Sequence, residues 1–184
     1  MYKIGFEILY LNRKGINLLG FNKIRLNNLL EMEQILSTID FETKGQGFTD
    51  ITKDINHWIK YKKLKKGILL IFLKHTSCSL IINENADINV LKDLSAYMNA
   101  IVPEEGVYPI NKNLKKIEYL HSEEGLDDMP AHIRTMLTSN NLSFSVVDGK
   151  LEIGLWQAIY IWEHRASNKS RSLQLHAIGD FDLN

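Results

Sequence analysis

The stretch ILLIFLKHTSCSLII, residues 68–82, contains two β-type runs separated by a short polar link. Residues 68–73 are an unbroken apolar run of strand length, which predicts a strand that is buried on both faces. His75 lies just beyond the end of this strand, and residues 77–82 form the second β-rich run. The pair therefore predicts buried β structure with a histidine at its border.

Helical spacing appears on both sides of these two strands. Residues 50–61 place apolar side chains at helical intervals, and residues 87–101 do so again until Pro103 ends the pattern. A third, short helix is expected over residues 130–137. Residues 104–124 are polar and too many for a plain connection, which is typical of a binding loop.

The last third of the chain is almost entirely β-type sequence with short connections. Asp148-Gly149 between two β-rich runs is a strong signal for a hairpin turn. Besides the two runs above, the expected strands cover residues 35–41, 142–147, 151–154, 157–162 and 172–178. This order favours a single α+β domain in which mixed or antiparallel sheets pack with two to three helices.

Length and composition limit the class of protein. With 184 residues and 45% hydrophobic content, the chain is long enough to bury one core, so a single domain is expected. Its 22 basic and 22 acidic residues cancel, which leaves no overall positive field for binding nucleic acid or an anionic membrane. Cys78 is the single cysteine and fits a reducing compartment, so we expect a cytoplasmic protein.

Residues 1–31 are rich in Asn, Lys and Leu and differ in character from the rest of the chain. Their longest apolar run, residues 8–11, is far shorter than the roughly 20 residues that span a bilayer. We expect an N-terminal extension that lies outside a domain of residues 32–184. A basic interfacial segment or an organelle-targeting leader is the alternative.

Polar side chains are concentrated in HTSCSLIINENAD, which begins at His75. They belong to Thr76, Ser77, Asn83, Glu84 and Asn85. Because such groups are costly in an apolar core unless they are paired, their density beside a buried strand predicts a site. The alternative is a polar turn with capping Asx side chains. Cys78 is expected to be structural, because a nucleophile requires an adjacent base and a lowered pKa.

A second polar cluster, HSEEGLDDMPAHIR, begins at His121. His121 and His132, with carboxylates that include Asp127 and Asp128 between them, offer ligand types suited to a divalent metal. Backbone N–H groups at the helix start, together with Arg134, offer a site for phosphate. Against both readings, acidic residues at a helix start are also ordinary caps, and a spacing of eleven between two histidines is not a recognised metal motif.

The third cluster, GLWQAIYIWEHR, ends in the charged triplet Glu163-His164-Arg165. Arginine presents a fork that binds phosphate or carboxylate in a bidentate manner, and Glu163 is placed to orient it or a histidine. The alternative is an exposed strand end whose charges pair weakly. Trp156 and Trp162 are expected in the core.

In this order, the three clusters resemble the signature blocks of the YjbQ-like family, whose members are described as secondary thiamine-phosphate synthases. The resemblance covers about residues 39–179 and includes the segment GFTDIT before the first helix, whereas residues 1–31 have no counterpart. Cys78 stands where alanine is usual, and Leu126 stands where proline is frequent. The resemblance implies a compact YjbQ-like α+β fold, a homotrimer, and a pocket that holds histidines with a bound metal or anion.

The resemblance also implies roles for individual residues. A divalent metal, zinc or magnesium, would be held by His75, His121 and His132. The catalytic residues would be Glu84, Asp127, Glu163 and Arg165, and the substrate-binding residues Thr76, Ser77, Asn83, Asn85, Asp128, Gln157 and His164. In the implied reaction, a pyrimidine-methyl diphosphate joins a thiazole phosphate, and the metal with Arg165 stabilises the departing pyrophosphate.

Two other functions fit the same residues. One is metal-assisted hydrolysis of a phosphorylated metabolite, in which a metal-bound water attacks. The other is binding of a metabolite or metal without turnover. In each case the expected partner is a phosphorylated small molecule, and neither nucleic acid nor a membrane is expected to bind.

Overall fold

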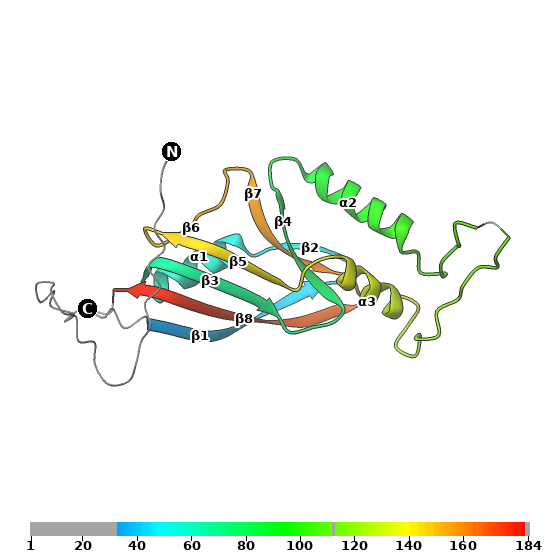
Figure 1. The fold of residues 1–184 in the computed structure, drawn as a ribbon, viewed down its shortest axis with the longest axis horizontal. Coiled ribbons are helices and arrows are strands. Elements are labelled where there is room, and N and C mark those ends of the chain that lie inside the picture. Colours follow the sequence, from blue (N-terminus) through cyan, green and yellow to red (C-terminus); the bar gives the residue numbers. More distant parts are fainter. Residues whose placement is uncertain (1–32, 112, 183–184) are drawn as a thin grey trace, which may run out of the picture. The chain divides into compact units, whose positions relative to one another are not determined.

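The strands form two antiparallel sheets in the part of the chain that the computed structural model describes, residues 33–111 and 113–182 (Figure 1). The five-stranded sheet has the order β1-β8-β3-β5-β6, and the three-stranded sheet has the order β2-β7-β4. In chain order the elements are β1 (Glu33–Lys44), β2 (Gly47–Asp50), α1 (Thr52–Tyr61), β3 (Leu64–Leu73), β4 (Cys78–Glu84), α2 (Ile88–Ile101), α3 (Asp128–Leu137), β5 (Asn141–Val147), β6 (Lys150–Leu151), β7 (Gln157–Glu163) and β8 (Asn168–Phe181). The predicted single α+β domain is confirmed.

The five-stranded sheet is built around β8, which pairs with β1 on one side and β3 on the other. Since side chains alternate across a strand, each strand offers one face to the core. Leu69, Ile71 and Leu175 lie on that inner face and are completely buried. The β5–β6 hairpin turns at Asp148 and Gly149, which both have positive φ, as the Asp-Gly signal predicts.

The outer face of this sheet is exposed, so one prediction about β3 is wrong. Residues 68–73 were expected to be buried on both faces, but Ile68 is 58% exposed, and Leu70 and Phe72 are also exposed. Leu36 on β1 is 60% exposed and lies on the same face, because Leu36 and Leu70 both pair with His176. We call Leu36, Ile68, Leu70 and Phe72 the outer apolar face. Among residues 33–111 and 113–182, the core covers one side of the sheet, and the apolar side chains on this side are exposed.

The three-stranded sheet lies between the main core and α2. Ile159 and Ile161 of β7 join the core formed with β3, β8 and α1. Alternate side chains of β7 face the other way, where Tyr160 packs with Leu91 and Trp162 packs with Met98. Because β7 is covered on both sides, its residues from position 158 to 163 are all buried. The short strand β2 has no counterpart among the predicted elements.

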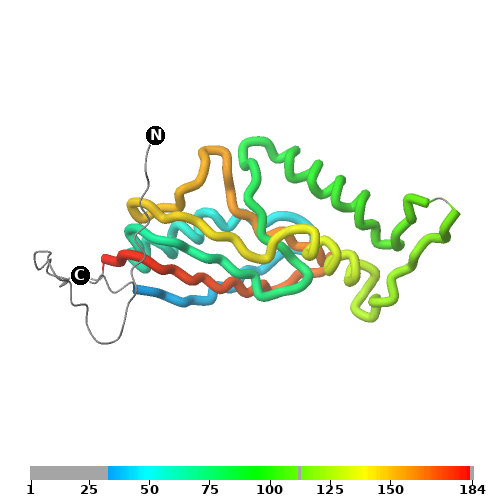
Figure 2. The backbone as a smooth tube through the Cα atoms, viewed as in Figure 1, coloured from blue at the N-terminus to red at the C-terminus, as the bar shows by residue number. Residues whose placement is uncertain are grey.

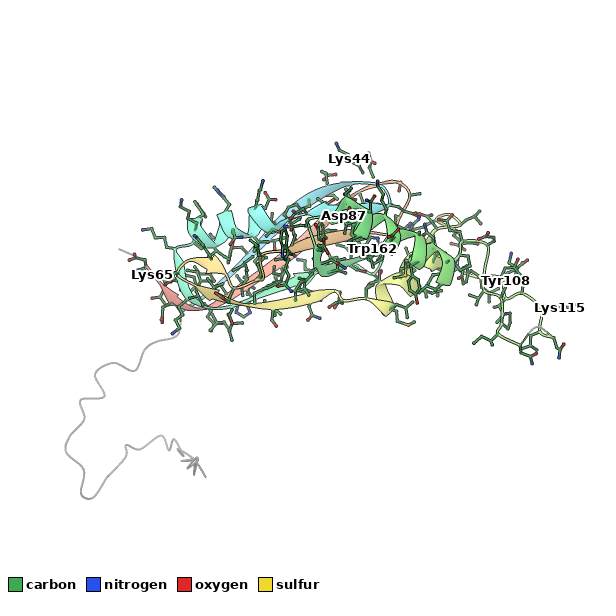
Figure 3. The ribbon with its side chains drawn as sticks, turned by 90° about the horizontal axis from the view of Figure 1, so that it is seen from above. Lys44, Lys65, Asp87, Tyr108, Lys115 and Trp162 are labelled. Carbon is green, nitrogen blue, oxygen red and sulfur yellow. The ribbon has the colours of Figure 1, made fainter. Side chains whose placement is uncertain are left out.

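Residues 102–127 join α2 to α3. Within the described part of this segment, Val107 and Ile117 form an isolated β-bridge. Figures 1 and 2 show that this segment projects beyond the ends of both helices, and Tyr108 and Lys115 mark it in Figure 3. α3 begins at Asp128, two residues before the predicted start. The first turn of α3 and the residues before it therefore lie at one end of the sheets.

Two expectations concern the chain's surroundings. The predicted extension of residues 1–31 lies outside the described residues, so that prediction stays a prediction. Within the described residues, none of the helices combines the length and the apolarity that crossing a bilayer requires.

Candidate functional site

Arg165 connects the end of β7 to the start of α3. Its Nε donates to Asp127 Oδ2 at 3.0 Å, its Nη1 donates to an oxygen of Asp128, and its Nη2 donates to the Glu124 carbonyl oxygen at 2.8 Å. Burial opposes the charged form, but the hydrogen bond and charge of Asp127, followed by Asp128, raise the pKa of Arg165. The guanidinium thus fixes the acidic segment before α3 against the sheet.

His121, Asp128 and His132 form a compact group of three ligand atoms. Each residue offers one donor atom, and these atoms all lie within 4.8 Å of one another. Asp128 Oδ2 lies 3.0 Å from His121 Nε2, and Asp128 Oδ1 lies 3.6 Å from His132 Nε2. In a tetrahedral zinc site with bonds of about 2.0–2.1 Å, neighbouring donor atoms lie about 3.3 Å apart. The two histidine–carboxylate separations lie on either side of that value, one to each oxygen of Asp128.

The two contacts of His132 determine which of its nitrogens is free. Nδ1 lies 2.9 Å from the Thr76 carbonyl oxygen. Because a carbonyl oxygen only accepts, Nδ1 carries a proton, so Nε2, on the side of Asp128, is the ring nitrogen available to a metal. Metal-binding histidines in proteins are commonly oriented in this way, by a hydrogen bond from the other ring nitrogen.

The two carboxylate oxygens of Asp128 have different surroundings. One carboxylate oxygen accepts from Arg165. The other, Oδ2, is buried and makes no hydrogen bond in the described residues, although His121 Nε2 lies 3.0 Å away. The separation is short but the angles are not those of a hydrogen bond. An orphaned carboxylate oxygen beside the His121 nitrogen, in a carboxylate that also lies near the His132 nitrogen, fits a shared cation.

The charges around this group are unbalanced. Arg165 forms ion pairs with Glu124, Asp127 and Asp128, so three carboxylates face one guanidinium. Burial alone would raise the pKa of Asp127, but the hydrogen bonds from the Ala166 N–H and from Arg165 lower it overall. The excess of negative charge favours a further cation at the two histidines.

His75 does not join the other two histidines. Its Nε2 accepts a hydrogen bond from the Ser172 N–H at 2.8 Å, which directs the ring toward β8. Burial, assisted by the charge of Arg171, lowers the pKa of His75. The predicted set of three imidazoles is therefore corrected to two imidazoles and the Asp128 carboxylate. Thr76, which follows His75, contributes its backbone oxygen to His132.

Glu163, predicted to be catalytic, is 1% exposed and fully occupied. Oε2 accepts from Arg171 Nε at 2.6 Å and from Thr43 Oγ1 at 2.7 Å. Oε1 accepts from Arg171 Nη2 at 2.5 Å and from the backbone N–H groups of His164 and Arg165. Burial opposes ionisation, but these hydrogen bonds, led by Arg171, lower the pKa of Glu163 overall. Glu163 orients the end of β7 and has no free lone pair for shuttling protons.

Arg171 was missed by the sequence reasoning, although the sequence contains a signal for it. In β8 it is 4% exposed and alternates with Leu173, Leu175 and Ala177, so it lies on the inner face of the sheet. An arginine on the apolar face of a strand needs a buried partner. That partner is Glu163, and the Ser77 hydroxyl also accepts from Arg171 Nη2 at 3.1 Å.

Four predicted site residues lie at the opposite end of the three-stranded sheet. Glu84 pairs with Gln157, whereas Cys78 pairs with Glu163, six positions along the strands. At about 3.3 Å per residue the two ends lie roughly 20 Å apart. Asn83, Glu84 and Gln157 line an open hollow of about 510 Å³, next to Asn85, whose N–H donates to the Trp156 carbonyl oxygen. These residues are therefore separate from the His121–Asp128–His132 group.

The remaining predictions concern His164, Cys78 and the two tryptophans Trp156 and Trp162. Burial, followed by the charge of Arg134, lowers the pKa of His164 to about 3, and its Nε2 lies 2.7 Å from the Ser79 hydroxyl. Burial raises the pKa of Cys78 to about 12, which supports its structural interpretation. Trp162 is 6% exposed as predicted for a core residue, but Trp156 is 62% exposed, so its predicted burial is wrong.

Relatives of known sequence match most of the chain. A UPF0047 protein of Synechocystis sp. is 39% identical over 138 residues, which cover 75% of this chain and 87% of the relative. The UPF0047 protein YjbQ of Escherichia coli O157:H7 is 34% identical over 137 residues, covering 74% and 91% respectively.

Solved structures match the fold. An uncharacterized YjbQ/UPF0047 protein of Clostridium acetobutylicum has a TM-score of 0.62 at 26% identity, covering 76% of this chain and 98% of its own. A protein of unknown function from Sulfolobus solfataricus P2 has a TM-score of 0.63 at 19% identity, covering 80% and 100%.

These relatives correct the predicted activity. None of the names of these four proteins mentions thiamine-phosphate synthesis, and two of the proteins are described as uncharacterized or of unknown function. The prediction that this chain joins a pyrimidine to a thiazole phosphate is therefore wrong. The family itself is supported, because the model of the family "UPF0047 protein YjbQ-like" matches residues 37–180. The chain belongs to the UPF0047 YjbQ-like family.

Proposed function

We propose that this protein binds a divalent transition-metal ion through His121, Asp128 and His132. The observation that carries the proposal is that His121 Nε2 lies 3.0 Å from Asp128 Oδ2, a buried oxygen without a hydrogen bond, while His132 Nε2 lies 3.6 Å from Oδ1 of the same carboxylate. The surplus of carboxylates around Arg165 supports it, because a divalent cation would balance that charge.

The donor types favour zinc over magnesium. Zinc is commonly bound by histidine nitrogen and carboxylate oxygen, whereas magnesium prefers oxygen ligands in octahedral geometry and keeps several waters. Two of the three donors here are nitrogen. Of the two metals that the sequence suggests, zinc is therefore the proposed ion.

The proposal is tested by calorimetric titration of chelator-treated protein with zinc. Wild type is expected to bind one zinc per chain, and His121→Ala and His132→Ala are expected to weaken binding at least ~100-fold, because each removes one of three ligands. His75→Ala and His57→Ala are the matched controls, since their rings lie outside the donor set, and both should bind as wild type does. Equal zinc binding by His121→Ala and wild type would contradict the proposal.

A second candidate function is metal-activated hydrolysis of a phosphorylated small molecule. The exposure of His121, whose side chain is 57% accessible, supports it, because three protein ligands leave a coordination position that solvent can reach. A water bound there would have a lowered pKa and become a nucleophile. The test is release of inorganic phosphate from a panel of phosphomonoesters, which must require zinc and be lost in His132→Ala. Zinc binding without any release would leave metal binding as the function.

We also propose that copies of the chain associate through the outer apolar face, as a homotrimer in accord with the resemblance to the family. The support is that large aliphatic and aromatic side chains of β1 and β3 are exposed together on one side of the five-stranded sheet. Contiguous exposed apolar surface commonly marks a protein–protein interface.

A further inference from the structure

Arg134 of α3 is a buried cation that forms no ion pair among the described residues. Burial lowers the pKa of Arg134, and the charge of Glu104 opposes this decrease. Arg134 is 3% exposed, and within residues 33–111 and 113–182 no carboxylate forms an ion pair with it. Its Nη2 donates to the Val102 carbonyl oxygen at 2.8 Å, but its buried Nε has no hydrogen-bond partner. Because burying an unpaired guanidinium is costly, an acceptor beyond the described protein atoms is expected to meet it.

A second unsatisfied donor belongs to Tyr119, in the segment between α2 and α3. The Tyr119 hydroxyl is buried and has no hydrogen-bond partner among the described residues. Burial raises the pKa of Tyr119, and the charge of Arg134 opposes this rise. Since buried polar groups are nearly always hydrogen-bonded, each of these two donors is expected to meet an acceptor beyond the described protein atoms.

Two hollows adjoin Arg134 and have room for such a group. One, of about 150 Å³, lies between α2 and the end of β7 and is also lined by Asn99 and His164. The other, of about 320 Å³, is lined by Asn99, Arg134 and the segment from Pro103 to Glu105. A water molecule occupies about 30 Å³ of liquid, so either hollow accepts a group several times larger.

These hollows are distinct from the proposed metal site. Arg134 follows His132 by two residues, and at about 100° per residue the two side chains leave α3 in nearly opposite directions. His132 faces Asp128 and Thr76, whereas Arg134 faces Val102 at the end of α2.

We propose that Arg134, which lines the hollows beside α2, binds a small oxyanion, the phosphate or carboxylate group of a small molecule, and that the Tyr119 hydroxyl is the second donor to it. Arginine presents Nε and a terminal nitrogen as a fork that matches two oxygens of either group. The rim carries Glu104 and Glu105, and Gln46 Nε2 holds Glu104 Oε1 at 3.0 Å. These carboxylates repel a polyanion, so the rest of the ligand is neutral or positively charged.

The test is thermal unfolding of the full chain in the presence of a chelator, in sodium phosphate, sodium acetate or sodium chloride at equal ionic strength. Wild type should have a higher Tm in phosphate or acetate than in chloride, since a ligand that binds the native state stabilises it. The oxyanion that gives the larger shift identifies the preferred group. No shift in either would overturn the proposal.

Four variants assign any shift to the two donors. Arg134→Met should lose the shift, while Arg134→Lys, which keeps the charge without the fork, and Tyr119→Phe should reduce it. Asn99→Asp places a carboxylate beside Arg134, so it should raise the Tm in chloride and abolish the response to phosphate. His121→Ala, on the other side of α3, should keep the shift. Equal shifts in Arg134→Met and wild type would refute the proposal, even if every variant were less stable.

Discussion

The Nδ1 nitrogen of His132 lies 2.9 Å from the Thr76 carbonyl oxygen, so α3 is bonded to the link between β3 and β4. This contact determines the tautomer of the ring and turns Nε2 toward Asp128. It also explains why the region around His75 matters to a site that does not contain the His75 ring. The backbone of that link, and not its histidine, contributes to the candidate metal site.

Asp128→Asn tests the two roles of the Asp128 carboxylate, as a zinc ligand and as an acceptor from Arg165. We expect zinc affinity to fall at least ~10-fold, because the amide is a poorer ligand. Unfolding free energy should fall by about 2 kcal/mol, since Arg165 loses one charged acceptor but keeps Asp127 and Glu124. Zinc titration and urea unfolding measure the two effects. Glu124→Gln, at a side chain 71% exposed, is the control and should change stability little.

Glu163→Gln should strongly destabilise the protein, by about 3 kcal/mol at pH 7, because it leaves Arg171 buried without a counter-charge. The pKa of Glu163 is lower in the folded than in the unfolded chain. Its stabilisation is therefore fully present above the ordinary glutamate pKa and is lost as the pH falls through the folded value.

Urea unfolding of wild type and Glu163→Gln between pH 7 and pH 3 measures this dependence. The stability difference between the two proteins should be constant above about pH 5 and should shrink at lower pH. Glu152→Gln, at an exposed position, is the control. A difference that stays the same down to pH 3 would show that the carboxylate charge of Glu163 does not stabilise the fold.

Ile68→Lys should disrupt self-association without unfolding the chain. Ile68 is 58% exposed on the outer apolar face, so a charge there is tolerated by one chain but not at an apolar interface. Light scattering should give three times 21.2 kDa for wild type and a smaller mass for the variant. Tyr61→Lys, at a side chain 73% exposed on α1, should keep the wild-type mass. A single-chain mass for wild type would refute the assembly.

Cys78 should resist thiol reagents in the folded protein. Its side chain is fully buried, and burial raises its pKa to about 12, so at pH 8 the reactive thiolate is present at about one part in ten thousand. A colorimetric thiol assay should show slow labelling of native protein and immediate labelling in urea. Rapid labelling of native protein would contradict the structural role.

The elements of the fold were largely predictable because their signals are local. The helical spacing of Ile55 and Ile59 and the Asp148-Gly149 turn depend on neighbours in the sequence, and the structure confirms both. The predicted strand over residues 68–73 is also present in β3. Its exposed side was not predictable, because a continuous apolar run does not reveal what covers each face.

The site was only partly predictable, because it depends on which side chains meet in space. His121, Asp128 and His132 were all singled out, since residues four apart on a helix share a face and the cluster is short. His75 was grouped with them on chemical type alone, and the structure turns it toward Ser172. Arg171 was missed as a buried charge, because its partner Glu163 lies in another strand.

The most direct measurement of the central claim is a crystal structure of zinc-soaked protein with anomalous scattering recorded at the zinc edge. We expect a single strong peak about 2.0–2.2 Å from His121 Nε2, His132 Nε2 and a carboxylate oxygen of Asp128. A peak at His75, or no peak between His121 and His132 at saturating zinc, would contradict it.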